Sequence, residues 1–207
     1  GFYVIYRLVF VVQLFNLTYP QKNIWLMEKY NGNTPLNYIL GVVEIKNGFD
    51  YKKCNDAIND VIKNNDAMRI VTEEKDSNVC QYVKDYEYVN FENVDMSLFS
   101  DKEKEKNRND FGLRSLFSEK NVYYDFKILK YSDNEGIILA KLHHIISDAW
   151  SFGNIGTQII DHLEDNDVTD NKKPSYNDYI KSEDEYKNSE KYKKDELFWQ
   201  DYLKDIK

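Results

Sequence analysis

Two adjacent histidines, His143 and His144, are followed four residues later by Asp148 in the segment LAKLHHIISDAWSFGNIG. An imidazole titrates near neutral pH, so it can accept a proton from a nucleophile or donate a hydrogen bond to developing charge. An aspartate in front of a helix can instead cap that helix. A His/His/Asp group is also a possible set of metal ligands. The spacing of these residues discriminates among the three uses.

The segment GIILAKLHH, residues 136–144, has the composition of a β-strand. Side chains alternate between the two faces of a strand, so His143 shares a face with Lys141 and His144 shares the other with Leu142. Two histidines on opposite faces cannot reach one ligand, and we therefore expect no metal site. On spacing alone, a functional histidine at the strand end and a pair of partly buried histidines bonded to backbone carbonyls fit equally well.

Apolar periodicity and turn residues predict one α+β domain with a helical C-terminal extension. Asp50 is the expected N-cap of the second helix, and Pro20 lies in the first turn of the helix that opens near Thr18. The predicted helices span residues 18–32, 49–65, 150–163 and the tail from 174. The predicted strands span residues 36–48, 67–74, 78–83, 87–91, 121–131 and 136–146. The charged run 100–112 is expected to be a solvated helix or loop.

Composition excludes several classes of function. The net charge is -8 and no Lys/Arg-rich block occurs, which argues against a nucleic-acid partner. Cys54 and Cys80 lie far apart, as expected for reduced thiols in a cytoplasmic protein. The apolar N-terminal segment is interrupted by Arg7 and Gln13, is short for a membrane span and lacks the features of a signal peptide. We expect a cytoplasmic protein without a membrane partner.

Several segments resemble motifs of the condensation domains of nonribosomal peptide synthetases. LHHIISDAWS resembles the active-site motif H-H-x-x-x-D-G, with Ala149 in place of the glycine. TYPQKNIWLME resembles the opening motif, with Gln21 and Trp25 in the expected places. VIKNNDAMRIV resembles the second motif, R-H-E-x-L-R-T, with Arg69 at its last arginine and Asn65 in place of its histidine. FWQDYLKDI resembles the helix that leads out of the first half of such a domain.

The resemblance covers about residues 17–207 and implies a chloramphenicol-acetyltransferase-like fold. This is an α+β, two-layer sandwich with a mixed sheet flanked by helices, built as two lobes with the active site between them. Only one lobe of the two is expected here. Residues 1–16 would be an N-terminal extension or a strand, and residues 17–165 the N-terminal lobe. Residues 166–207 would be a linker and a helical segment leading to a missing C-terminal lobe.

The resemblance also implies roles for individual residues in an amide-forming acyltransferase. His144 would accept a proton from the acceptor amine, or hold that amine, and stabilise the charged intermediate as it attacks a donor thioester. His143 would orient the loop, and Asp148 would form a structural ion pair with Arg69. Ala149, Trp150 and Ser151 would border the substrate passage. No cofactor is expected to bind directly, because both substrates arrive on phosphopantetheine arms.

The implied partners are the carrier (thiolation) domains and the adenylation domain of the same synthetase. An exposed lobe face could also form a homodimer. Two alternatives stay open: an O-acyltransferase of the same superfamily that makes lipid or alcohol esters, and a non-catalytic docking lobe. The departures at Asn65 and Ala149 give some weight to the non-catalytic docking lobe.

Overall fold

The computed structural model describes residues 13–31, 35–75, 78–115, 122–166 and 174–206. The strands are β1 (Phe15–Asn16), β2 (Tyr38–Ile45), β3 (Ile70–Lys75), β4 (Asn78–Val83), β5 (Glu92–Asp95), β6 (Tyr124–Lys130) and β7 (Gly136–His143). The α-helices are α1 (Tyr19–Asn31), α2 (Tyr51–Asn64), α3 (Asp101–Leu113), α4 (Ala149–Leu163), α5 (Tyr176–Lys187) and α6 (Glu190–Leu203). Two short 3-10 helices, η1 (Pro35–Asn37) and η2 (Asp66–Arg69), precede β2 and β3.

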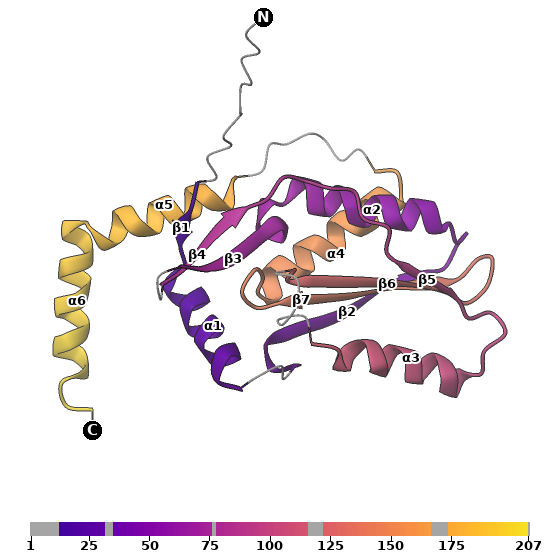
Figure 1. Ribbon diagram of the computed structural model, residues 1–207, viewed down its shortest axis with the longest axis horizontal. Helices are drawn as coiled ribbons and strands as arrows, with labels where there is room; N and C mark the ends of the chain where they lie inside the picture. Colours follow the sequence, from indigo (N-terminus) through magenta and orange to yellow (C-terminus); the bar gives the residue numbers. More distant parts are fainter. Residues whose placement is uncertain (1–12, 32–34, 76–77, 116–121, 167–173, 207) are drawn as a thin grey trace, which may run out of the picture.

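The strands form two sheets, of which the larger is mixed. Its order is β2-β7-β6-β5, with β5 parallel to β6 and the other pairs antiparallel. The smaller sheet has the order β1-β4-β3. Figure 1 shows α2 and α4 over one face of the larger sheet and α3 beneath the other. The expected α+β architecture, a mixed sheet flanked by helices, is confirmed.

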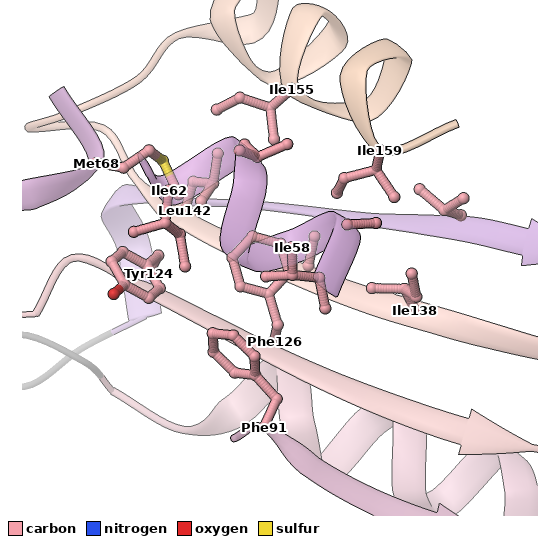
Figure 2. Packing of buried hydrophobic residues seen from close by; sticks show 14 of the residues in the cluster. Ile58, Ile62, Met68, Phe91, Tyr124, Phe126, Ile138, Leu142, Ile155 and Ile159 are labelled. Carbon is pink, nitrogen blue, oxygen red and sulfur yellow. The ribbon is translucent and has the colours of Figure 1, made fainter. Parts of the chain in front are cut away.

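The main core lies between the four-stranded sheet and the helices α2 and α4 (Figure 2). The apolar spacing of α2 places one face of the helix in this core, as the sequence predicts, and Asp50 caps its N-terminus. Fully buried aliphatic side chains meet there from both helices and from β7: Ile58, Ile62, Ile159, Ile138 and Leu142. Each contributes about 1.5–3 kcal/mol through burial. The opposite face of the sheet packs Leu139 against Phe111 of α3.

The strand predicted over residues 87–91 is wrong. This segment is an irregular loop, and β5 begins only at Glu92. Two buried asparagines of α2 take the place of a neighbouring strand: Asn59 bonds both the N–H and the carbonyl of Val89, and Asn55 accepts from the N–H of Phe91. The backbone is satisfied by side chains far away in sequence, which strand propensity alone does not reveal.

Other boundaries differ in smaller ways. Residues 67–69 belong to η2, so β3 starts at Ile70. The charged run forms a helix, α3, because Ser100 and Glu103 build a capping box at its start. The helical tail is confirmed as α5 and α6. The predictions for residues 1–12, for a helix end at Gly32 and for the linker around residues 167–173 lie outside the described residues.

The C-terminal helices are held by few contacts. Asp66 of η2 accepts hydrogen bonds from the hydroxyl of Ser175 and the N–H of Tyr176, which ties the start of α5 to the main domain. Beyond it, α6 projects from the body (Figure 1), and none of its residues is buried. Within the described part of the chain, no helix combines the length and apolar character that a membrane span needs.

Candidate active site

The histidine pair lies where β7 ends and the chain turns towards α4. The N–H of His143 still donates to the carbonyl of Tyr123 at 2.8 Å, and that of His144 donates to the carbonyl of Asn37 at 2.8 Å. His143 is completely buried, whereas His144 is exposed. The two rings therefore point into different surroundings, as the alternation of a strand predicts. The turn is closed by a hydrogen bond from the N–H of Ile146 to the carbonyl of His143.

The exposed ring of His144 is held in one protonation pattern. Its Nδ1 lies 3.2 Å from the carbonyl oxygen of Ser147. A carbonyl oxygen only accepts hydrogen bonds, so Nδ1 carries a proton in this contact, and in the neutral ring the lone pair lies on Nε2. A neutral imidazole with its lone pair on an exposed ring can accept a proton from a nucleophile brought to the surface.

The buried ring of His143 has the opposite pattern. Its Nδ1 accepts a hydrogen bond from the N–H of Ile145 at 3.0 Å, so the proton lies on Nε2. Nε2 then donates to Oε1 of Glu28 at 3.2 Å. Burial lowers the pKa of His143, and this outweighs the nearby carboxylate of Glu28, which raises it. A neutral, buried ring with both nitrogens occupied can orient the turn but cannot reach a substrate.

Asp148 caps α4. Its Oδ1 accepts from the N–H and from the hydroxyl of Ser151, each at 2.7 Å. These two donors lower the pKa of the Asp148 carboxyl, which makes it a poor proton acceptor at neutral pH. The side chain is exposed rather than buried. Asp148 is therefore the N-cap of α4, the use that its place in front of a helix allows.

The predicted ion pair between Asp148 and Arg69 is wrong. Arg69 instead donates to main-chain carbonyls, at 2.6 Å to Ile62, 2.6 Å to Lys63 and 3.1 Å to Lys84. Two of these carbonyls belong to the last turn of α2, where helical partners run out. Both charged groups thus find local hydrogen-bond partners, and neither is left buried and in need of the other.

The two positions that depart from the family motifs also have local roles. Asn65 is the C-cap of α2, and its side-chain amide donates to the carbonyl of Val61 at 2.7 Å and to Oε1 of Gln158 at 2.8 Å. It therefore links α2 to α4. Ala149 is the first residue of α4 and has a helical backbone; among the described non-glycine residues only Asp165 has a positive φ. Alanine costs no backbone strain there.

Trp150 and Ser151 follow in the first turn of α4. Trp150 is 79% exposed, which is unusual for an indole ring. The hydroxyl of Ser151 is engaged by Asp148. Of the three residues expected to border the substrate passage, Ala149 and Trp150 are thus exposed beside the turn, while Ser151 serves the cap.

Two side chains hold the turn from behind: Glu28, which sequence reasoning missed, and Gln21, which it placed in the opening motif without a role. Glu28, only 2% exposed, accepts from His143 and from the side-chain amide of Asn37 at 2.7 Å. Gln21, 3% exposed, donates to the carbonyl of Ile145 at 3.0 Å. The spacing of seven residues between Gln21 and Glu28, two helical turns, was the available signal. In the part of the chain that the structure describes, no group of three His, Cys, Asp or Glu side chains could hold a metal ion.

These features define an α+β lobe with a mixed sheet and a histidine pair at the end of an interior strand. The sequence model of the condensation domain matches residues 12–207, so the chain belongs to the condensation domain family. Members of this family act as acyltransferases in nonribosomal peptide synthetases.

Relatives and solved structures agree with this assignment. The chain is 28% identical over 195 residues to a plipastatin synthase protein of Bacillus subtilis (strain 168), covering 89% of the chain and 7% of the relative. It is 26% identical to surfactin synthase subunit 1 of the same organism, covering 94% of the chain and 6% of the relative. The starter condensation domain of rhizomide synthetase RzmA superposes with a TM-score of 0.85 at 16% identity, covering 94% of the chain and 49% of that structure.

A second solved structure gives the same picture. The first condensation domain of the calcium-dependent antibiotic synthetase, in complex with substrate analogue 2a, has a TM-score of 0.78 at 14% identity. The alignment covers 94% of the chain and 48% of that structure. The chain therefore spans about half the length of the solved domains and a small part of the curated synthetase proteins.

Proposed function

We propose that this chain is one lobe of an enzyme that forms amide bonds between carrier-bound substrates in nonribosomal peptide synthesis. Residues 17–165 are the N-terminal lobe, and residues 166–207 lead to a second lobe that completes the cleft. The observation that carries the proposal is the geometry of His144: an exposed ring whose Nδ1 is bonded to the carbonyl of Ser147, which leaves the lone pair on Nε2.

That geometry supports the following reaction. The acceptor amine attacks the carbonyl carbon of the donor thioester, and Nε2 of His144 accepts the proton that the amine loses as the C–N bond forms. The resulting imidazolium stabilises the negative charge of the tetrahedral intermediate. When the C–S bond breaks, the imidazolium returns this proton to the sulfur, and the donor arm leaves as a thiol. His143 holds the turn, and Asp148 caps α4.

The substrates reach this site on phosphopantetheine arms of carrier domains, and the adenylation domain of the same synthetase loads them. The relatives' nature as peptide synthetases supports these partners. A mutant of the rhizomide starter condensation domain has been solved in complex with C8-CoA and Leu-SNAC. Exposed Trp150 lies next to the site and is suited to pack against such an arm.

The second lobe would also explain the exposed apolar face of α6. Phe198 stacks on Tyr202, and Trp199 contacts both rings edge-on, while each of the three stays more than half exposed. A face of this kind on a projecting helix is typical of a surface covered in the assembled protein. A homodimer through the same face is the competing arrangement, and the oligomeric state by light scattering distinguishes the two.

The test is His144→Ala in the protein as it is encoded, with both carrier-bound substrates supplied. Loss of a proton acceptor should lower the rate of amide formation by roughly 10²–10⁴-fold, measured by mass spectrometry. His162→Ala, a change at a surface histidine bonded to Asp60, is the matched control and should leave the rate unchanged. Parent activity in His144→Ala would refute the proposal. Ester formation with a hydroxyl acceptor, in place of amide formation, would favour the O-acyltransferase alternative.

A further inference from the structure

The two most buried side chains of α1 are polar, which is unusual for a helix that packs on a domain. Its two buried residues are Gln21 and Glu28, which lie two helical turns apart on the same face. Ile24 and Trp25, which lie between them in sequence, pack against the core only partly buried. A helix normally buries apolar side chains and exposes polar ones. Both polar side chains form hydrogen bonds to the turn that carries His144, which gives one reason for the burial of both.

Gln21 holds the turn through its backbone. Its amide donates to the carbonyl of Ile145 at 3.0 Å, and it exchanges a pair of hydrogen bonds, at 2.9 Å and 2.8 Å, with the side chain of Gln81. Gln81 in turn donates to the carbonyl of Asn16 in β1. The turn is thereby connected to α1 and to the smaller sheet at one point.

Glu28 reaches His144 by two routes that start at one oxygen atom. Oε1 accepts from Nε2 of His143, and Nδ1 of the same ring accepts from the N–H of Ile145, the residue after His144. Oε1 also accepts from the side chain of Asn37 at 2.7 Å, and the backbone carbonyl of Asn37 accepts from the N–H of His144. One oxygen of Glu28 therefore fixes the backbone N–H of Ile145 through His143 and the backbone N–H of His144 through Asn37.

We propose that Glu28 is a positioning residue that selects the Nε2–H tautomer of His143 and thereby holds the turn on which His144 is presented. The reason is the balance of donors and acceptors in the ring. With an acceptor at Nε2, Nδ1 is free to accept from the N–H of Ile145. Without that acceptor, the proton can move to Nδ1. The Nδ1–H and the N–H of Ile145 would then be two donors that face each other, and the turn would open.

Stability alone does not account for a carboxylate at this place. Glu28 is 2% exposed, and its Oε2 has no hydrogen-bond partner among the described residues. A buried carboxylate with half of its acceptors unused is costly, and an apolar side chain would avoid this cost. The benefit therefore comes from the other oxygen, Oε1, which orients the ring of His143 and fixes the backbone at Asn37.

The first arm of the test measures the tautomer directly and does not depend on activity. The sequence has three histidines, so ¹⁵N-histidine labelling of the 207-residue chain gives three imidazoles, assigned by single substitutions. Parent His143 should show one tautomer with the proton on Nε2, and the amide of Ile145 should exchange slowly with solvent. Glu28→Gln keeps an accepting oxygen and should keep both properties. Glu28→Leu should give a mixture of tautomers and faster exchange at Ile145.

The second arm measures activity in the protein as it is encoded. A misplaced reacting group costs about 100-fold in rate, so Glu28→Leu should lower kcat by roughly 10–100-fold with a smaller effect on KM. Glu28→Gln should restore the rate to within a few-fold of the parent. Asn59→Leu is the matched control: it removes an equally buried polar side chain that bonds Val89 and does not contact the turn.

The outcomes separate this proposal from the proposed function on which it rests. If parent His143 is a mixture of tautomers, or if Glu28→Leu leaves the tautomer unchanged, the proposal is overturned, and the parent spectrum decides this even if Glu28→Leu does not fold. Equal rates for Glu28→Leu and Asn59→Leu would also overturn it. If His144→Ala keeps parent activity, the proposed function fails, while the spectra still show whether Glu28 holds the turn.

Discussion

Replacement of Asp148 by alanine distinguishes a helix cap from a buried ion pair. Loss of an N-cap costs about 0.5–2 kcal/mol, and the charge at a helix N-terminus contributes about 0.3–1 kcal/mol of related stabilisation. Breaking a buried ion pair would cost about 3–5 kcal/mol, because the partner stays buried and uncompensated. Asp148 is exposed and bonds only within the first turn of α4, so we expect Asp148→Ala to lower the free energy of unfolding by about 1–2 kcal/mol.

Urea unfolding of the 207-residue chain, followed by circular dichroism, measures this difference. In a thermal scan the same change lowers Tm by about 2–8 °C. Asp148→Asn is the matched control: asparagine caps about as well as aspartate, so the loss should stay within a few tenths of a kcal/mol. A double-mutant cycle with Arg69→Ala should be additive to within about 0.5 kcal/mol, since the two side chains share no partner.

The pH dependence follows from the lowered pKa of Asp148. A carboxyl whose pKa is lower in the folded state stabilises the fold above its unfolded pKa, and this contribution is lost as the pH falls through the folded value. The difference between parent and Asp148→Ala should therefore persist at neutral pH and narrow below the usual pKa of 3.8. A loss above about 3 kcal/mol, or a strong coupling energy with Arg69, would refute the cap and favour the ion pair.

Three further predictions address the site and the sheet. Ala149→Gly should leave activity similar to or higher than that of the parent, because residue 149 has a helical backbone and the change removes one exposed methyl group; a large loss of amide formation would show that the methyl group is needed for packing. The 207-residue chain, supplied with both carrier-bound substrates, should form no more product by mass spectrometry than its His144→Ala variant. The reason is that the exposed ring of His144 has no second wall among the described residues to exclude water. Product above that control would contradict a site built from two lobes. Lys141 is fully buried and donates to the carbonyl of Arg114, and burial lowers its pKa to about 8. The parent should therefore gain stability relative to Lys141→Met as the pH rises from about 8 towards 10. A difference in unfolding free energy that stays constant over this range would contradict the buried amine.

The order and type of most elements could be predicted from local sequence. The apolar spacing of α2 and the Asp50 cap, the hairpin of β6 and β7, and the helical start of α4 are all encoded within a few residues of where they form. The alternation of side chains along β7 correctly placed His143 and His144 on opposite faces, and the structure shows that His143 is buried and His144 exposed. Such features depend on backbone geometry and on neighbours close in sequence, which is why pattern reasoning recovers them.

What failed depended on contacts between segments distant in sequence. The loop at residues 87–91 has strand-like composition, yet asparagines of α2 satisfy its backbone. The charges of Asp148 and Arg69 suggested a mutual pair, although each found main-chain partners nearer to itself. In both cases the polar groups found hydrogen-bond partners, as buried polar groups generally do. Which group became the partner was decided only when helices and strands packed together.

Residue order was enough to show that a histidine motif ends a central strand, that its two rings face opposite ways and that the chain resembles condensation domains. The side chains that hold this motif became evident only from the packed fold. Glu28 lies 115 residues before His143 in the chain, and no local pattern links them. They meet because α1 packs behind the turn, where low dielectric and exclusion of water make each hydrogen bond to a buried ring specific and its loss costly.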